Sequence, residues 1–314
     1  MKQRARVAVV GSANIDLVVR TPRMPAKGET ILGGPFFSGQ GGKGANQAVS
    51  AARLGAAVEM VARLGRDEFG EMVAANLAGE GIGLDSVLRS ADVHTGVAFI
   101  IVDAEGENMI VVASGANAEL SPDDVAAARE AVLDAQLVVL QLESPMETVR
   151  YTAGLAHNAG VKVLLNPAPG RALDEALLRD IDVLTPNQTE ARLITGVDAA
   201  TPEQAERAAR RLLQKGVGTV IVTLGADGAL AVSKAASGEA WAHHVPGYQV
   251  DVVDTTGAGD AFNGALAVAL AEDQPLLEAV RFANAAAALQ VTRQGAAPAM
   301  PTREEVETFL AAQD

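Results

Sequence analysis

The chain has 314 residues, no cysteine and a net charge of −14, from 25 lysines and arginines against 39 aspartates and glutamates. Its 49% hydrophobic residues are too many for a disordered chain, and its length allows a sizeable core without disulfides, in one large or two moderate domains. The absence of cysteine excludes disulfide frameworks, thiolate metal sites and iron–sulfur clusters. The negative charge makes nucleic acid and anionic membranes poor partners.

The N-terminus places three basic residues before a short apolar run that ends at Gly11. A secretory signal needs about 7–15 apolar residues, and a membrane span needs roughly 18 in succession. The run at residues 7–10 is shorter than both, so we expect a cytoplasmic protein.

The first part of the chain mixes two kinds of pattern. Residues 6–10 predict a buried strand, and helix 43–54, strand 58–64 and helix 69–80 are expected later. Between them, residues 17–39 carry prolines, glycines and short alternating pieces that are typical of β-hairpin or edge material outside a main sheet. Residues 96–113 alternate in the same way around a polar turn.

Helices and strands alternate from residue 121 onward. We predict helices at 121–134, 145–159, 202–215, about 260–272 and 275–292, and strands at 137–142, 161–166 and 219–224. Such alternation indicates an α/β fold with a mostly parallel sheet and helices on both faces. The expected body comprises residues 1–15, 40–94 and 115–314, and residues 16–39 and 95–114 form a small inserted β subdomain.

A glycine-dense segment, Gly39–Gly44, opens the first predicted helix. It fits the G-x-G-x-x-G spacing of dinucleotide-binding proteins but does not follow the first strand, and Ala45 stands where a Walker A loop needs lysine. Backbone can approach a ligand closely at such a turn, and a helix N-terminus favours oxygen-rich groups. Lys43 and Asn46 lie at its mouth. The alternative is a tight turn with a surface lysine.

Three polar residues follow predicted strands, namely Asn14, Asp16 and Glu143. The carboxyl ends of parallel strands are where open α/β sheets bind ligands. An asparagine offers donors and an acceptor, and a carboxylate accepts two hydroxyls, so these residues together with Lys43 and Asn46 suit a polyhydroxyl ligand such as a sugar. Each alone is also a common cap or turn residue.

The sharpest motif is the string Asp254-Thr-Thr-Gly-Ala-Gly-Asp-Ala-Phe-Asn-Gly264. Its free N–H groups at a helix start would form an anion-binding nest for a transferring phosphoryl group. Asp260 would then accept a proton from an attacking hydroxyl, and the helix dipole should keep it ionised. The alternative is that Asp260 is only an N-cap.

Two further segments suit a nucleotide and its metal. Asn187 and Glu190 lie one helical turn apart, and Mg²⁺ prefers one or two carboxylates with water and phosphate oxygens, although a helix cap is an equal interpretation. The turn Thr223–Gly228 suits a phosphate or ribose contact, or a plain left-handed turn. The four histidines show no metal-ligand spacing.

These strings together resemble the ribokinase branch of the sugar kinase family that also includes fructokinases and adenosine kinase. The resemblance covers essentially the whole chain. It rests on residues 11–16, 41–48, 141–145, 166–169, 185–190, 254–260 and 291–296. It implies phosphorylation of D-ribose at O5 by MgATP, a Rossmann-like body, and a β lid that also forms the contact of a homodimer.

The resemblance also assigns roles to single residues. Ribose would be held by Asn14, Asp16, Gly42, Lys43, Asn46 and Glu143. Asp260 would be the base, and Gly257, Ala258 and Gly259 the anion hole. ATP would contact Asn187, Thr223, Gly225, Asp227, Gly228, Gly259 and Asn284, with Glu190 organising Mg²⁺.

Members of this family are activated by K⁺ beside the anion hole. By resemblance, the ligands would be Asp254, Thr256, Gln290, Arg293 and Gly295, largely through backbone carbonyls. Ala299 stands where these kinases often carry serine, and Asn284 where some carry histidine against the adenine. The first difference removes a hydroxyl ligand, whereas asparagine still contacts a base edge.

Other functions remain open at this point. A kinase of 2-deoxyribose, another pentose or a nucleoside would share the motifs, and Asp16 bears on that choice because the 2- and 3-hydroxyls are its expected partners. A non-catalytic sugar-binding protein would need neither a Mg²⁺ site nor a base. A nicotinamide oxidoreductase is disfavoured by the position of the glycine motif.

Overall fold

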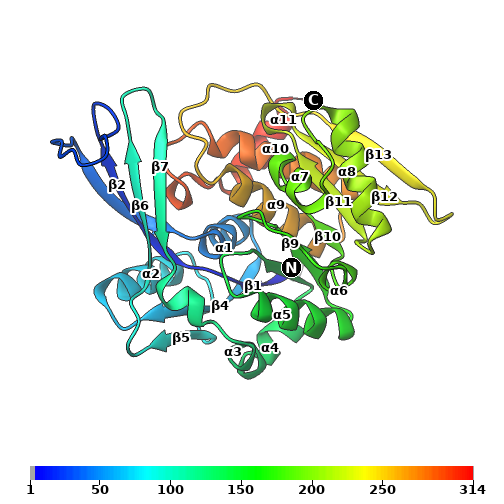
Figure 1. Cartoon of the computed structure of the whole chain (residues 1–314). Coiled ribbons are helices and arrows are strands. Elements are labelled where there is room, and N and C mark those ends of the chain that lie inside the picture. Colours follow the sequence, from blue (N-terminus) through cyan, green and yellow to red (C-terminus); the bar gives the residue numbers. More distant parts are fainter. Residues whose placement is uncertain (1–3, 314) are drawn as a thin grey trace.

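The structure is a computed structural model that describes residues 4–313, whose strands form two sheets (Figure 1). The larger has nine strands in the order β13-β12-β11-β10-β9-β8-β1-β4-β5. Its strands are β1 Arg6–Val10, β4 Ala57–Gly65, β5 Val87–Ser90, β8 Leu137–Leu140, β9 Lys162–Leu165, β10 Val183–Leu184, β11 Thr219–Thr223, β12 Ala229–Lys234 and β13 Ala240–Val245. Only the pairs β11–β12 and β12–β13 of this sheet are antiparallel. The predicted α/β fold with a mostly parallel sheet is therefore confirmed.

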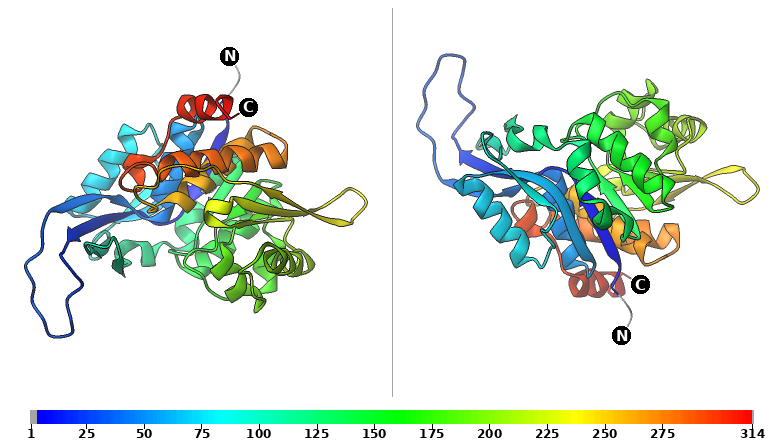
Figure 2. Two further views of the ribbon diagram at one scale, coloured as in Figure 1. Left: turned by 90° about the horizontal axis from the view of Figure 1, so that it is seen from above. Right: turned by 90° about the horizontal axis from the view of Figure 1, so that it is seen from below.

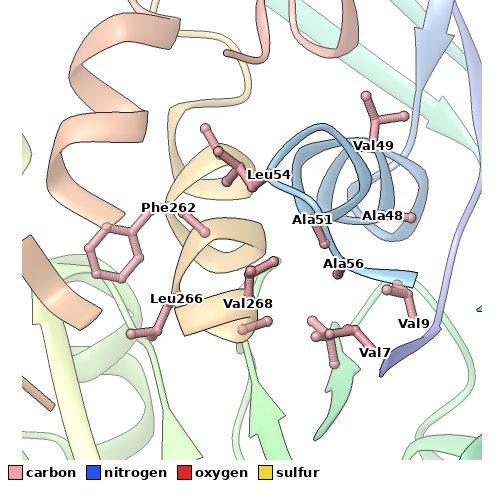
Figure 3. Packing of buried hydrophobic residues seen from close by; sticks show 14 of the residues in the cluster. Val7, Val9, Ala48, Val49, Ala51, Leu54, Ala56, Phe262, Leu266 and Val268 are labelled. Carbon is pink, nitrogen blue, oxygen red and sulfur yellow. The ribbon is translucent and has the colours of Figure 1, made fainter. Parts of the chain in front are cut away.

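Helices cover both faces of this sheet because side chains alternate along each strand. Val7 and Val9 of β1 lie in one core, whereas Ala8 and Val10 lie in the other. The first core packs against α1 Lys43–Arg53, α2 Glu68–Gly79, α9 Ala258–Ala271, α10 Leu276–Gln290 and α11 Arg303–Ala311. The second packs against α3 Pro122–Ala127, α4 Arg129–Leu133, α5 Met146–Asn158, α6 Glu175–Arg179, α7 Gln188–Thr195 and α8 Pro202–Gln214. Figure 3 shows α1 and α9 meeting above β1 through small and branched side chains, which bring the two helices close together.

The order of the strands creates a crevice next to β1. The chain leaves β1 for β4 on one side and later returns with β8 on the other. Where neighbouring connections diverge in this way, ligands bind outside the carboxyl ends of the strands. The loops that follow β1 and β8 therefore line the crevice.

The smaller sheet has the order β3-β2-β6-β7 and stands beside the body (Figure 1). Its strands are β2 Asn14–Arg20, β3 Phe36–Gly41, β6 Gly96–Val102 and β7 Asn108–Ala113. The two irregular segments of the sequence thus pair in one sheet, β2 running parallel to β6 and antiparallel to β3. The connection between β2 and β3 extends away from the body (Figure 2). The division into two domains stays a prediction.

Some elements differ from the expectation. The predicted helix 121–134 is two helices, because the backbone at Ala128 leaves the helical conformation (φ −88°, ψ 17°) and ends α3. The strands β5, β10, β12 and β13 and the helices α6 and α11 were not predicted, and α7 was indicated only by the helix-cap interpretation of Asn187 and Glu190. β12 and β13 are rich in alanine and contain two histidines, so periodicity gave no strong strand signal.

No helix in residues 4–313 combines the length and apolar character that crossing a membrane requires.

Candidate active site

The crevice beside β1 begins with two polar residues on β2. Asn14 is buried, and its Oδ1 accepts a hydrogen bond of 2.6 Å from Asn117 Nδ2. Asn117 lies in the short helix η1 (Gly115–Glu119), and its Oδ1 accepts from the Ala13 backbone amide. This pairing turns the Asn14 amide group into a fixed donor. Asn117 was not predicted, because its partners are about a hundred residues away in sequence.

The N-terminus of α1 fixes the next part of the site. Glu143, in the loop after β8, accepts hydrogen bonds through Oε2 from Ser12 Oγ (2.5 Å) and from the Lys43 backbone amide (3.0 Å). The preceding Gly42 is the N-cap of α1 with φ +87°, and a Cβ there would lie 2.8 Å from the Ala13 Cα. Only glycine fits this approach. The loop after the first strand, the glycine turn and Glu143 thus lie next to one another, as the sequence led us to expect.

Asp16 has an unusual electrostatic environment. Burial, followed by the nearby negative charges of Glu143 and Asp260, raises its pKa to about 7. Lys43 has the opposite role: burial opposes its charge, but Asp260, Glu143 and Glu190 outweigh that effect and raise its pKa. The positive charge of Lys43 therefore compensates only part of the negative charge of the carboxylates around it. Hydrogen bonds from the hydroxyl groups of a ligand would stabilise the remaining negative charge.

Asp260 lies at the third position of α9, whose N-cap is Gly257, so the interpretation of Asp260 as an N-cap is wrong. Its carboxylate accepts hydrogen bonds from Asn46 Nδ2 (2.9 Å) and Gln47 Nε2 (3.0 Å), both on α1. Burial raises its pKa, while Lys43 and the two amides counteract the rise. The expectation from the helix dipole alone was incomplete, because desolvation acts in the opposite direction and is the larger effect.

Gln47 organises a buried network around Asp260. Its Oε1 accepts from Gln141 Nε2 (2.7 Å), and its Nε2 also donates to Asn166 Oδ1 (3.1 Å). Asn46 Oδ1, by contrast, is buried with no hydrogen-bond partner in the described residues. A ligand hydroxyl would satisfy it, since an unpaired buried acceptor is costly. Gln47, Gln141 and Asn166 lay within the motif strings but were not predicted as site residues.

Two adjoining cavities extend from Asp260. One of about 240 Å³ is lined by Lys43, Asn187, Glu190, Asp260 and the segment Gly257–Gly259, among others. The other, of about 360 Å³, is more apolar and is lined by Gly225, Gly228, Tyr248, Phe262 and Asn284, among others. Thr223, Thr255, Ala258 and Gly259 border both. The predicted phosphate region and a nucleobase-sized pocket are therefore continuous.

Glu190 and Asn187 form a reciprocal cap on α7. The Asn187 side chain accepts from the Glu190 amide, and Glu190 Oε2 accepts from the Asn187 amide at 2.9 Å. The cap interpretation is confirmed, and both residues also line the smaller cavity. Burial raises the pKa of Glu190. No group of three or more His, Asp or Glu side chains in residues 4–313 is placed to hold a metal ion. One carboxylate fits Mg²⁺ only in its usual form, with water and nucleotide phosphates as the other ligands.

Two predicted nucleotide contacts are placed differently. Asp227 is exposed and does not line the apolar cavity, although Gly225, Ala226 and Gly228 around it do. Asn284 does line it, but its Nδ2 donates to the carbonyls of Val245 and Pro246, both at 3.1 Å. Only its Oδ1 is left to meet an adenine edge.

The predicted cation residues meet beside the anion hole. Gln290 Nε2 donates to the carbonyls of Thr256 (2.5 Å) and Gly295 (3.0 Å). Asp254 accepts from the amides of Thr256 and Gly295, which outweigh its burial and lower its pKa. The Arg293 side chain points elsewhere and pairs with Glu305.

Known proteins resemble this chain in sequence and in fold. The sequence model of the pfkB family carbohydrate kinases matches residues 4–303. The chain is 42% identical to the ribokinase of Haemophilus influenzae, covering 98% of this chain and 99% of that protein, and 39% identical to the deoxyribokinase of Salmonella typhi, covering 97% and 98%. The structure of Arabidopsis thaliana ribokinase complexed with ribose and ATP matches with a TM-score of 0.88 at 37% identity, covering 98% of this chain and 99% of that one. This chain therefore belongs to the pfkB family of carbohydrate kinases.

Proposed function

We propose that this kinase phosphorylates D-ribose at O5 with MgATP and releases D-ribose 5-phosphate and ADP. The observation that carries the proposal is the position of Asp260. Hydrogen bonds from Asn46 and Gln47 hold it between the polar pocket of Asn14, Asp16 and Glu143 and the cavity that leads to the nucleotide region. The relatives named ribokinase, and the neighbour with ribose and ATP, support the same choice.

The arrangement suits phosphoryl transfer between two bound substrates. Asn14, Asp16 and Glu143 bind the sugar hydroxyls, which leaves the 5-hydroxyl facing Asp260. As the O5–phosphorus bond forms, the O5 proton passes to Asp260, the bond from the γ-phosphorus to the bridging oxygen breaks, and ADP leaves. The N–H groups of Gly257 and Gly259 at the start of α9 have no intrahelical partner and would hold the charge on the transferred group, whereas the Ala258 N–H donates to the Thr255 carbonyl at 3.2 Å.

Glu190 and Asn187 would hold Mg²⁺ through water beside the phosphates. The ion, when bound, neutralises phosphate charge during transfer. Potassium is not part of this proposal, because the residues that would bind it already bond to each other. The cytoplasmic location expected from the sequence, where ATP is supplied, stays with the proposal.

The small sheet is proposed to act as a lid over the sugar and as the contact of a homodimer. Phe36, Phe99, Met109 and Val111 lie on one face of it, as the strand register shows, and all are more than half exposed. A contiguous apolar surface of this kind is typical of a protein interface. Closure of a lid would also exclude water from the transfer step.

The test is an ADP-release assay with MgATP against D-ribose, 2-deoxyribose, fructose and adenosine. Preference for D-ribose is expected. Preference for 2-deoxyribose would keep the mechanism and change the acceptor, an alternative that the 39% identity to a deoxyribokinase favours over the other sugars. Binding of ribose with no turnover of any acceptor would favour a sugar-binding protein and contradict the role of Asp260.

A further inference from the structure

The side chain of Gln290 fills the space between two loops beside the anion hole. Gln290 ends α10 and is fully buried, with 0% of its surface exposed. Its Nε2 bonds the Thr256 carbonyl at 2.5 Å and the Gly295 carbonyl at 3.0 Å. Both carbonyls belong to the set that the family resemblance assigns to K⁺. Gln290 Nε2 therefore occupies the position that a cation bound by both carbonyls would take.

Other oxygens of the residues in that set are engaged as well. Asp254 Oδ1 accepts from the Thr256 amide and Oδ2 from the Gly295 amide, both at 2.9 Å. The carbonyl of Gln290 itself accepts from the Arg293 amide at 3.1 Å. Ala299 is buried and has no hydroxyl to offer. Because a bare cation needs several oxygen ligands to replace its water, this constellation does not fit K⁺.

The orientation of the amide supports this interpretation. Two carbonyl acceptors require the NH₂ group of Gln290, which has two donors, and not its oxygen. In this orientation the other end of the amide, Gln290 Oε1, is buried with no hydrogen-bond partner in the described residues. Leaving a buried acceptor unpaired is costly, so the two hydrogen bonds from Nε2 to the loops must outweigh that penalty.

The Thr256 carbonyl belongs to the same peptide group as the N–H of Gly257. In a planar trans peptide these two groups point in opposite directions. A bond that fixes the carbonyl therefore also fixes the direction of the Gly257 N–H, at the N-cap of α9 and at the edge of the phosphate cavity. Gln290 can thus orient an anion-hole donor without touching the substrate.

We propose that the side-chain amide of Gln290 takes the place of a monovalent cation, so that this kinase orients its anion hole without K⁺. The inference deepens the proposed function, on which it rests for its kinetic readout. Gln290 would act as a positioning residue. Its presence would remove the requirement of the kinase for K⁺.

The experiment compares the wild type with Gln290→Ala and Gln290→Leu. Alanine frees both carbonyls and leaves space for an ion, whereas leucine removes the amide and keeps most of the volume. Crystals soaked in Tl⁺, which is close to K⁺ in radius, report occupancy by anomalous scattering independently of activity. Turnover is measured in K⁺, Na⁺ and tetramethylammonium chloride, and melting temperatures in the same salts show whether each variant is folded.

For the wild type we expect no Tl⁺ peak between Thr256 and Gly295 and turnover that changes less than about twofold between the salts. Gln290→Ala should gain the Tl⁺ peak and be activated about fivefold or more by K⁺, and Gln290→Leu should gain neither. A Tl⁺ peak in the wild type, or none in folded Gln290→Ala, would overturn the inference. If no sugar is phosphorylated in any salt, the proposed function fails, while the Tl⁺ maps still decide the cation question.

Discussion

The surroundings of Asp260 suit the proton transfer that we propose for it. The amides of Asn46 and Gln47 aim it, and burial raises its pKa, which makes it a better base than an exposed aspartate. Its position inside the first turn of α9 places it next to the proposed anion hole. In the proposed reaction the same residue would therefore contact both the attacking hydroxyl and the surroundings of the transferred group.

Asp260→Ala should lower kcat by about 10²–10⁴-fold, the usual effect of losing a general base. The contribution of the nucleobase to ATP binding should change little, because the apolar cavity does not contain Asp260, which borders the adjoining phosphate cavity. Steady-state kinetics with D-ribose, together with calorimetric titration of the nucleotide, checks both statements. A kcat close to the wild-type value would reduce Asp260 to a structural role.

Asp16 predicts a pH dependence of sugar binding. Its pKa is raised to about 7 by burial and by the charges of Glu143 and Asp260. Only the ionised form accepts hydroxyl hydrogen bonds at both oxygens, so affinity for D-ribose should increase with pH and fall about tenfold from pH 8 to pH 6. Titration of ribose without ATP isolates this step.

The control for this prediction is the Asp16→Asn variant, which cannot titrate at this position. Its weaker ribose affinity should be the same at pH 6 and pH 8. A wild-type affinity that does not change over this interval would contradict the assignment of Asp16 to the sugar hydroxyls.

At the scale of elements, the sequence predicted the features that are specified by residues close together in the chain. Buried apolar runs such as β1 and β8, and glycine turns that open helices, were predicted correctly because neighbouring residues specify them. Asn14, Asp16 and Glu143 were grouped because they follow strand ends, and Lys43 was added to them from the glycine turn that opens the first helix. Gln47 was missed because its partner Asp260 is 213 residues away, and only the packing of α1 against α9 brings them together.

The start of α9 carries a prediction about backbone conformation. Gly257 has φ +85°, and a Cβ there would lie 2.9 Å from the Ala296 Cβ. Gly257→Ala should therefore lower stability by about 1–3 kcal/mol, from the left-handed backbone and the contact together. It should also lower kcat while the KM for D-ribose changes little, because the sugar residues lie on other elements.

Chemical unfolding and steady-state kinetics test the Gly257 variant. Gly259→Ala is the matched control, since Gly259 has no positive φ and a Cβ there meets no atom within 4 Å. Equal losses of stability in the two variants would show that the conformation of Gly257 is not what α9 depends on.

At the scale of the whole molecule, the two sheets contribute different residues to the candidate site. The nine-stranded sheet carries Glu143, Asn187 and Thr223 at its carboxyl edge, and the smaller sheet brings Asn14 and Asp16 to the same place. The sequence indicated two segments of β-hairpin character, but their pairing across about eighty residues depends on tertiary packing. A site assembled from two sheets in this way is complete only when they approach each other.

The exposed face of the small sheet leads to the last prediction. Phe99 and Val111 are direct partners across β6 and β7, with 52% and 68% of their surfaces exposed. If this face joins two copies of the chain, Phe99→Asp with Val111→Asp should dissociate the dimer, because two buried acidic groups would lack partners. In sedimentation velocity at micromolar concentration, the main species should change from dimer to monomer, and the KM for D-ribose should rise as the lid loses support.

The matched control is Tyr151→Asp, which changes an exposed aromatic side chain on α5 and should leave both quantities unchanged. A wild type that sediments as a monomer would exclude the lid as a dimer contact, since its apolar face would then be free in solution.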